Sequence, residues 1–256
     1  MLILDAHAHL GHDVVFDEEG TEEELLEWHE RCQISGAIIQ PFVPRPYLSD
    51  TEAIHDRITA MCKKHSGRYF GMASINPHLR PEEYEGEAAR CVKELRFVGV
   101  KLTPIAHAAH PASRDGRHVF EVASALNVPV MVHTGAGIPF ADPAAVETAA
   151  SSFTKVPIIL AHAGTDLFFA QVLSLARRYE HVYLEPSWLS ILNVRKALHT
   201  VGPGKIMFSS DHAVNIPVEL CKYRTLLPPG EALSKVLGGT AREVFGLAGR
   251  LVGENL

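Results

Sequence analysis

The sequence lacks the features by which membrane, secreted and nucleic-acid-binding proteins are recognised. No apolar run is long enough to cross a bilayer, and the N-terminus has neither a basic region nor a small-residue cleavage site. The net charge is −6 and no run of lysine or arginine stands out, so nothing provides a footprint for a phosphate backbone. We therefore expect a cytoplasmic protein whose partners include neither nucleic acid nor a membrane.

Cysteine is also scarce, with four residues in a chain of 256. The four lie far apart in the sequence, and three of them sit in helical patterns beside apolar residues, as buried thiols do. This spacing gives no sign of a disulfide framework and fits a reducing cytosol. The four residues are Cys32, Cys62, Cys91 and Cys221.

The sequence does contain a series of short apolar runs, each of which ends in polar or turn residues. They recur roughly every 24 to 34 positions, which is the period of a βα unit. Runs rich in valine, isoleucine and leucine suit parallel strands that are buried on both faces. The eight runs cover residues 2–6, 36–42, 69–75, 98–102, 128–133, 157–161, 181–185 and 205–209.

Helical patterns fill the segments between these runs. Thr21 with Glu24, and Ser49 with Glu52, form capping-box sequences before two of the helices. Eight strand–helix units match a (β/α)8 TIM barrel, and the Gly-x-Gly-x-x-Gly pattern found in many open doubly wound sheets does not occur. We therefore predict one α/β barrel domain over residues 1–256, with helices at its C-terminus.

Side chains that bind metals end or follow several of the predicted strands. The carboxyl ends of the strands of such a barrel meet at one face, where the chemistry of this fold takes place. His7 and His9 are two positions apart, so both rings share one face of a strand, about 7 Å apart along the backbone. The residues at the ends of strands one, four, five, six and eight are His7, His9, Lys101, His133, His162 and Asp211.

Each of these residues taken singly has a simpler interpretation. A histidine near a strand end is more often a hydrogen-bonded core residue than a ligand, and Asp211 can cap the following helix. Histidines and an aspartate that converge without a cation are costly, however, so their joint placement predicts a metal site. Lys101 either anchors an anionic substrate, or is modified, or turns away from the ion.

The order His-x-His, Lys, His, His, Asp on these strands resembles the amidohydrolase superfamily. The wording His162-Ala163-Gly164 and Ser209-Ser210-Asp211 is similar to its amidohydrolase-2 branch. The resemblance spans nearly the whole chain. It implies that the metal site is formed by His7, His9, His133, His162 and Asp211. It also implies that Asp211 transfers protons. In members with two metals the lysine of strand four is carboxylated and bridges the ions, whereas several members of the branch use one metal.

Nitrogen and carboxylate ligands with an open position suit Zn²⁺ best, as one ion or two, with Mn²⁺ as the next candidate. Such an ion lowers the pKa of bound water to about 7, and Asp211 can accept the proton, with His162 as the second catalytic residue. The main hypothesis is therefore a metal-dependent hydrolase of a small-molecule amide, lactone or ester. His7-Ala8-His9 favours this choice, because many decarboxylases of the branch resemble a Glu-x-His version of the motif.

The sequence leaves other functions open. The first alternative is a non-oxidative decarboxylase that acts on an aromatic or semialdehyde acid at the same metal site. A TatD-type deoxyribonuclease ranks lower, because those proteins resemble a carboxylate at strand four, where this chain has Lys101. The non-enzymatic alternative is a binding or regulatory barrel with an inert metal site. The sequence does not say whether the chain forms homo-oligomers.

Substrate-binding residues are expected in the loops that follow the strands. Arg45, in a proline-rich loop after strand two, can clamp a carboxylate, although a surface role is the simpler interpretation. His107 follows strand four, and Trp188 follows strand seven. We predict these three as substrate contacts, with Trp188 equally suited to packing.

Overall fold

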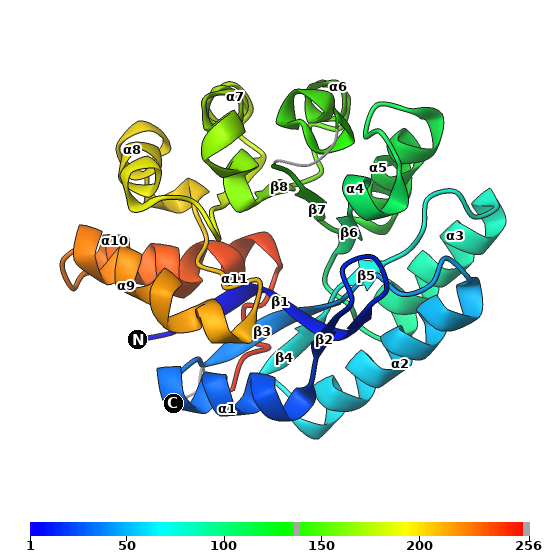
Figure 1. Ribbon diagram of the computed structural model, residues 1–256, viewed down its shortest axis with the longest axis horizontal. Coiled ribbons are helices and arrows are strands. Elements are labelled where there is room, and N and C mark those ends of the chain that lie inside the picture. Colours follow the sequence, from blue (N-terminus) through cyan, green and yellow to red (C-terminus); the bar gives the residue numbers. More distant parts are fainter. Residues whose placement is uncertain (136–138, 253–256) are drawn as a thin grey trace.

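The chain folds into a barrel of mainly parallel strands surrounded by helices (Figure 1). The description rests on a computed structural model and covers residues 1–135 and 139–252. Within these residues the strands are β1 (Leu4–Asp13), β2 (Glu18–Gly20), β3 (Gly36–Pro41), β4 (Tyr69–Gly71), β5 (Ala73–Ser74), β6 (Val100–Leu102), β7 (Val130–His133), β8 (Ile158–Ala161) and β9 (Val182–Glu185).

Two ladders make up the barrel wall. One has the order β2-β1-β3-β4, and the other runs from β5 through β6, β7 and β8 to β9. The predicted third strand, 69–75, is divided between them at Met72, whose amide donates to Ile39 O at 2.8 Å, while the Ala73 amide donates to Gly99 O at 3.0 Å. Because consecutive amides bond to opposite neighbours, the wall continues through this point.

The predicted eighth strand, 205–209, closes the barrel with less regular pairing than expected. In place of a full ladder, Ile206 forms a single bridge to Leu184, and Asp211, two residues beyond the predicted strand, forms another to Ala8. The buried carboxylate of Asp5 reinforces the closure, since it accepts hydrogen bonds from the amide of Ser210 at 3.0 Å and from its hydroxyl at 2.5 Å.

Strand β1 extends further than the sequence predicts. It was expected to end at residue 6, but it continues to Asp13, because its second half pairs antiparallel with β2 and forms a hairpin at the carboxyl face. The register against β3 shifts between Asp5 and Ala8. His7 and His9 therefore lie within the strand. His9 pairs with Gln40 of β3, whereas His7 lies in the shift, and its carbonyl oxygen accepts from the Asp211 amide at 2.8 Å.

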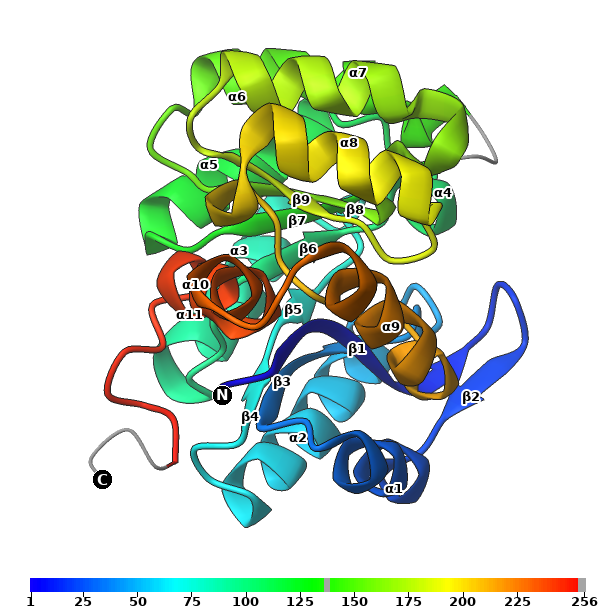
Figure 2. The ribbon, with the colours of Figure 1, turned by 90° about the vertical axis from the view of Figure 1, so that its left-hand side faces the viewer.

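Helices cover the outside of the barrel, as the two views show (Figures 1 and 2). Within the described ranges, no helix combines the length and the apolar character that a bilayer span needs. The helices are α1 (Glu22–Cys32), α2 (Leu48–Lys64), α3 (Pro81–Ala89), α4 (Pro104–His107), α5 (Arg114–Leu126), α6 (Glu147–Ser152), α7 (Thr165–Arg178), α8 (Ile191–Val201), α9 (Ile216–Leu226), α10 (Glu231–Ser234) and α11 (Thr240–Val244).

The two capping predictions had different outcomes. The Thr21 hydroxyl accepts from the Glu24 amide at 3.1 Å and starts α1 as predicted. The prediction for Ser49 is wrong, because α2 begins one residue before it and Tyr47 occupies the cap position without a side-chain bond.

The core has two layers. One fills the space between the barrel wall and the helices, and the other fills the barrel itself. Phe245, Leu247 and Leu251 of the C-terminal segment belong to the inner layer, so this segment packs against the interior of the barrel. Polar side chains gather where the strands end, at the opposite face.

Candidate active site

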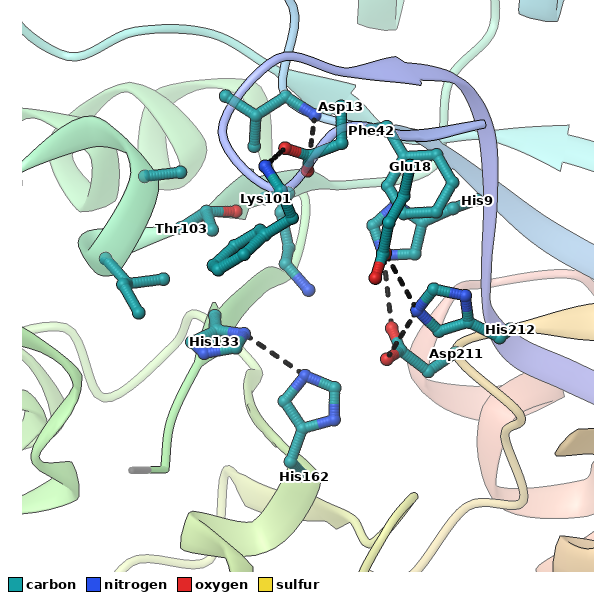
Figure 3. Close-up of a pocket in the computed structure, with 14 residues that line it drawn as sticks. His9, Asp13, Glu18, Phe42, Lys101, Thr103, His133, His162, Asp211 and His212 are labelled. Atoms are coloured by element: carbon teal, nitrogen blue, oxygen red, sulfur yellow. Dashed lines mark hydrogen bonds and ion pairs between the residues drawn. The ribbon is translucent and has the colours of Figure 1, made fainter. Parts of the chain in front are cut away.

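A cavity of about 250 Å³ opens at the carboxyl ends of the strands (Figure 3). A cavity of this size suits a small-molecule ligand. Histidines and acidic residues form one part of its wall, and apolar side chains form another. The lining residues are His9, Asp13, Phe16, Glu18, Phe42, Val43, Lys101, Thr103, Ile105, Ala106, His133, His162, Asp211 and His212.

Three ligand atoms converge at the floor of this cavity. The Nε2 atoms of His7 and His9 lie 2.9 Å apart, and Asp211 Oδ1 lies 3.2 Å from each of them. His7 is fully buried, and Asp211 is carried there by the closing strand, with its backbone at φ 65° in the left-handed region. We call these three residues the metal cradle.

The outer hydrogen bonds of the two rings decide what the cradle can hold. His7 Nδ1 lies 2.6 Å from Glu185 Oε2, and His9 Nδ1 lies 3.0 Å from the carbonyl oxygen of Pro41. Since a carboxylate and a carbonyl only accept, each Nδ1 carries the hydrogen and each Nε2 presents a lone pair. Three acceptor atoms then face one another, an arrangement that fits a divalent cation bound by two imidazoles and a carboxylate.

Electrostatics agree with this assignment. Burial and the Lys101 ammonium lower the pKa of His7 to about 3, so the ring is neutral at physiological pH. Burial alone would raise the pKa of Asp211, but the histidines around it hold that pKa well below its usual range. Neutral imidazoles and an ionised carboxylate are the protonation states that metal binding requires.

Glu185 holds several residues of the site in place through hydrogen bonds. The sequence places it at the end of a strand but does not predict this role. Its Oε2 atom bonds His7 and accepts from the His162 amide at 3.2 Å. Its Oε1 atom accepts from the Ser187 amide at 2.8 Å and from the Ser209 hydroxyl. Burial opposes its charge, but His7 and these hydrogen bonds keep the pKa of Glu185 well below its usual range.

His133 and His162 form a second pair beside the cradle. His162 Nε2 lies 3.1 Å from His133 Nδ1, and the His162 ring is 5.1 Å from the ring of His7. Burial lowers the pKa of both imidazoles. Together with His7 and Glu185, His162 forms a second group whose ligand atoms lie close enough to hold an ion. The structure thus brings all four predicted histidines to one place.

Lys101 is the buried cation of the site. It extends from β6 to place Nζ 3.0 Å from His7 Nε2, so its ammonium donates to the lone pair that a cation in the cradle would take from it, and the residue is 2% exposed. Burial lowers the pKa of Lys101 to about 8, which the charges of Asp211 and Glu185 only partly offset. Among the described lining residues it is the sole lysine or arginine, so it is the group best placed to meet a substrate anion.

The three predicted substrate contacts fare differently. Arg45 is exposed and does not line the cavity, so the predicted carboxylate clamp is not part of this site. His107 is buried in α4 beside two lining residues, but its own side chain does not line the cavity. Trp188 also lies outside the lining, but its Nε1 donates to Asp211 Oδ2 at 2.8 Å, so it acts on the cradle directly.

Comparison with known proteins agrees with this architecture. The family model described as amidohydrolase matches residues 4–247. The chain belongs to the amidohydrolase family. No curated protein matches it.

Solved structures similar to this amidohydrolase include three decarboxylases, which show the TIM-barrel fold. Dihydroxybenzoic acid decarboxylase from Polaromonas sp. JS666, with bound manganese and 2-nitroresorcinol, has a TM-score of 0.76 and 16% identity, covering 96% of this chain and 97% of its own. For 5-carboxyvanillate decarboxylase from Sphingomonas paucimobilis the TM-score is 0.75 at 16% identity, with 96% and 99% covered. The 2,6-dihydroxybenzoate decarboxylase from Rhizobium has a TM-score of 0.72 and 17% identity, covering 96% of this chain and 98% of its own.

Proposed function

We propose that this amidohydrolase is a metal-dependent, non-oxidative decarboxylase of a small aromatic acid. The observation that carries the proposal is the combination in one small cavity of the metal cradle, a buried lysine and an apolar wall. An anion fits beside Lys101, and an aromatic ring fits against Phe42 and Ile105. The decarboxylases that share the fold support this choice over the hydrolase that the His-x-His motif favours.

The residues divide the work of the reaction between them. The bond between the ring carbon and the carboxyl group breaks, its electron pair stays on the carbon, and a proton takes the place of the released CO₂. His7, His9 and Asp211 would hold a divalent ion, which would supply electrostatic stabilisation of the developing negative charge. Lys101 orients the substrate anion. Asp211 takes a proton from a water molecule that enters the cavity and gives it to the ring carbon, with His162 as the neighbouring base.

The donor set binds either Zn²⁺ or Mn²⁺. Neutral histidines and a carboxylate fit the predicted zinc, while the manganese in a structure with the same fold makes Mn²⁺ the ion to test beside it. Elemental analysis of the purified protein, followed by reloading of the metal-free protein with each ion separately, would identify which ion supports activity.

A substrate panel tests the proposed reaction. We expect the protein loaded with Mn²⁺ or Zn²⁺ to release CO₂ from at least one hydroxylated benzoate, measured by a coupled bicarbonate assay and by product mass. A parallel panel of lactones, esters and amides should give no hydrolysis. Hydrolysis without CO₂ release from any acid would overturn the proposal in favour of the hydrolase. The metal-free protein serves as the blank.

Lys101 should control the affinity for the carboxylate. Lys101→Met keeps most of the side-chain volume but removes the ammonium, so we expect KM for the acid to rise about 10- to 100-fold, the worth of one hydrogen bond to a charged group. Arg45→Met is the matched control, because Arg45 is an exposed cation outside the cavity, and its kinetics should match the parent protein. Metal content is measured in both variants. Unchanged KM in Lys101→Met would exclude this role.

A further inference from the structure

Residues of the loop after β9 and of α9 hold Asp211 in the metal cradle. No sequence motif predicts this interaction. Asp211 uses its two carboxylate oxygens differently. Oδ1 faces His7 and His9, whereas Oδ2 accepts from the indole Nε1 of Trp188 at 2.8 Å. With one oxygen held by a fixed donor, rotation of the carboxylate is restricted and Oδ1 stays directed at the cradle.

The indole can do this because the backbone of Trp188 is itself held in an uncommon conformation. Its φ is 66°, in the left-handed region that bulky residues rarely occupy. The Trp188 amide donates to Glu219 Oε1 at 2.9 Å, and Glu219 is 1% exposed at the base of the loop. A strained residue of this kind persists only where its surroundings fix it, and such residues cluster at functional sites.

Glu219 also acts on the backbone next to Asp211, through Asn215. Its Oε1 atom accepts from Asn215 Nδ2 at 3.2 Å, and the same amide donates to the carbonyl oxygen of Ser210 at 3.0 Å. Ser210 directly precedes Asp211, so one arm fixes the backbone that enters the aspartate and the other fixes its side chain. Lys222 Nζ completes the arrangement, since it lies 2.7 Å from Glu219 Oε1 and 2.8 Å from Leu189 O.

We propose that Trp188 is a positioning residue for Asp211, and that Glu219 sets Trp188 in place. This inference rests on the proposed metal-dependent function, in which Asp211 is both ligand and proton carrier. It replaces the prediction that Trp188 contacts the substrate. The indole ring is about half exposed and does not line the cavity, which agrees with action through the aspartate.

Metal binding provides a test that does not depend on activity. In a Trp28→Phe background Trp188 is the sole tryptophan, so paramagnetic Mn²⁺ added to the metal-free protein should quench its fluorescence as the cradle fills. By isothermal titration, Trp188→Phe should bind Mn²⁺ about 10- to 100-fold more weakly than the parent, as loss of a partner that orients a ligand does. Trp28→Phe alone is the matched control and should bind like the parent.

Kinetics distinguish a residue that positions Asp211 from one that contacts the substrate. We expect Trp188→Phe to lower kcat about tenfold and to leave KM for the acid within twofold. Glu219→Ala should behave similarly, and Glu219→Gln, which keeps the acceptor oxygen, should recover most of the loss. Normal Mn²⁺ affinity with unchanged kcat and a raised KM in Trp188→Phe would overturn the inference. If no acid is decarboxylated, the proposed function fails, while the Mn²⁺ titrations still decide the role of Trp188.

Discussion

Asp211→Asn should abolish catalysis, with kcat/KM falling on the order of 10³-fold or more. The substitution keeps the shape of the side chain but removes the only negative charge among the three cradle atoms, and it removes the group that accepts a proton. Bound metal should fall in parallel, because two neutral imidazoles and an amide hold a divalent cation more weakly. Steady-state kinetics and elemental analysis of the same preparation measure both effects.

A second aspartate provides the control for this experiment. Asp17 lies at the tip of the hairpin between β1 and β2, with a side chain that is 96% exposed and a left-handed φ of 57° that asparagine tolerates. Asp17→Asn should therefore leave both activity and metal content unchanged. An Asp211→Asn protein that keeps its metal and more than a tenth of its activity would contradict the cradle.

The metal cradle and the two histidines beside it could be predicted from the sequence, because the barrel makes position along the chain equivalent to position in space. Every parallel strand ends at the same face, so a histidine or aspartate at a strand end is already placed near the others. This rule brought together His7, His9, His133, His162 and Asp211 across more than 200 positions. The rule requires only the approximate ends of the strands. It therefore held although β1 is longer and the eighth strand less regular than predicted.

The supporting contacts could not be predicted in this way. Glu185 and His7 are 178 positions apart, and Trp188 reaches Asp211 only because its own backbone is left-handed. Which way a loop residue turns depends on packing that local sequence does not encode. Arg45 illustrates the opposite error, since its chemistry suited a carboxylate but its loop leaves it exposed. Residue type therefore predicted the cradle, whereas loop geometry decided its neighbours.

A second cluster shows why residue types alone do not identify a metal site. His55, Glu87 and Cys91 are fully buried and have ligand atoms as close together as those of the cradle. The Ser74 amide, however, donates to His55 Nε2 at 3.1 Å, so the hydrogen on Nδ1 points at Glu87, 2.6 Å away. Burial raises the pKa of the Cys91 thiol, which stays protonated. Hydrogens fill the space where a cation would sit, and the cluster joins α2 to α3.

Glu87 is therefore expected to contribute stability and not metal binding. Burial raises its pKa, but hydrogen bonds from His55 and Arg90 outweigh burial and lower the pKa of Glu87 to about 2. Relative to the ordinary value of 4.5, that shift corresponds to about 3 kcal/mol. Glu87→Gln should lower the free energy of unfolding at pH 7 by about this amount, measured by urea denaturation of the metal-free protein.

The pH dependence distinguishes loss of charge from loss of packing. Because the folded pKa is depressed, the contribution of Glu87 is complete above pH 4.5 and is lost as pH falls towards 2. The difference between the parent and Glu87→Gln should therefore be constant from pH 6 to 8 and shrink to about half near pH 3. Glu82→Gln, an exposed change on the same helix, should cost no more than about 0.5 kcal/mol at either pH. If Glu87→Gln lowers the free energy of unfolding equally at pH 3 and pH 7, the cluster requires the shape of the side chain and not its charge. If the loss of stability becomes smaller in acid, the stability comes from the ionised carboxylate between His55 and Arg90.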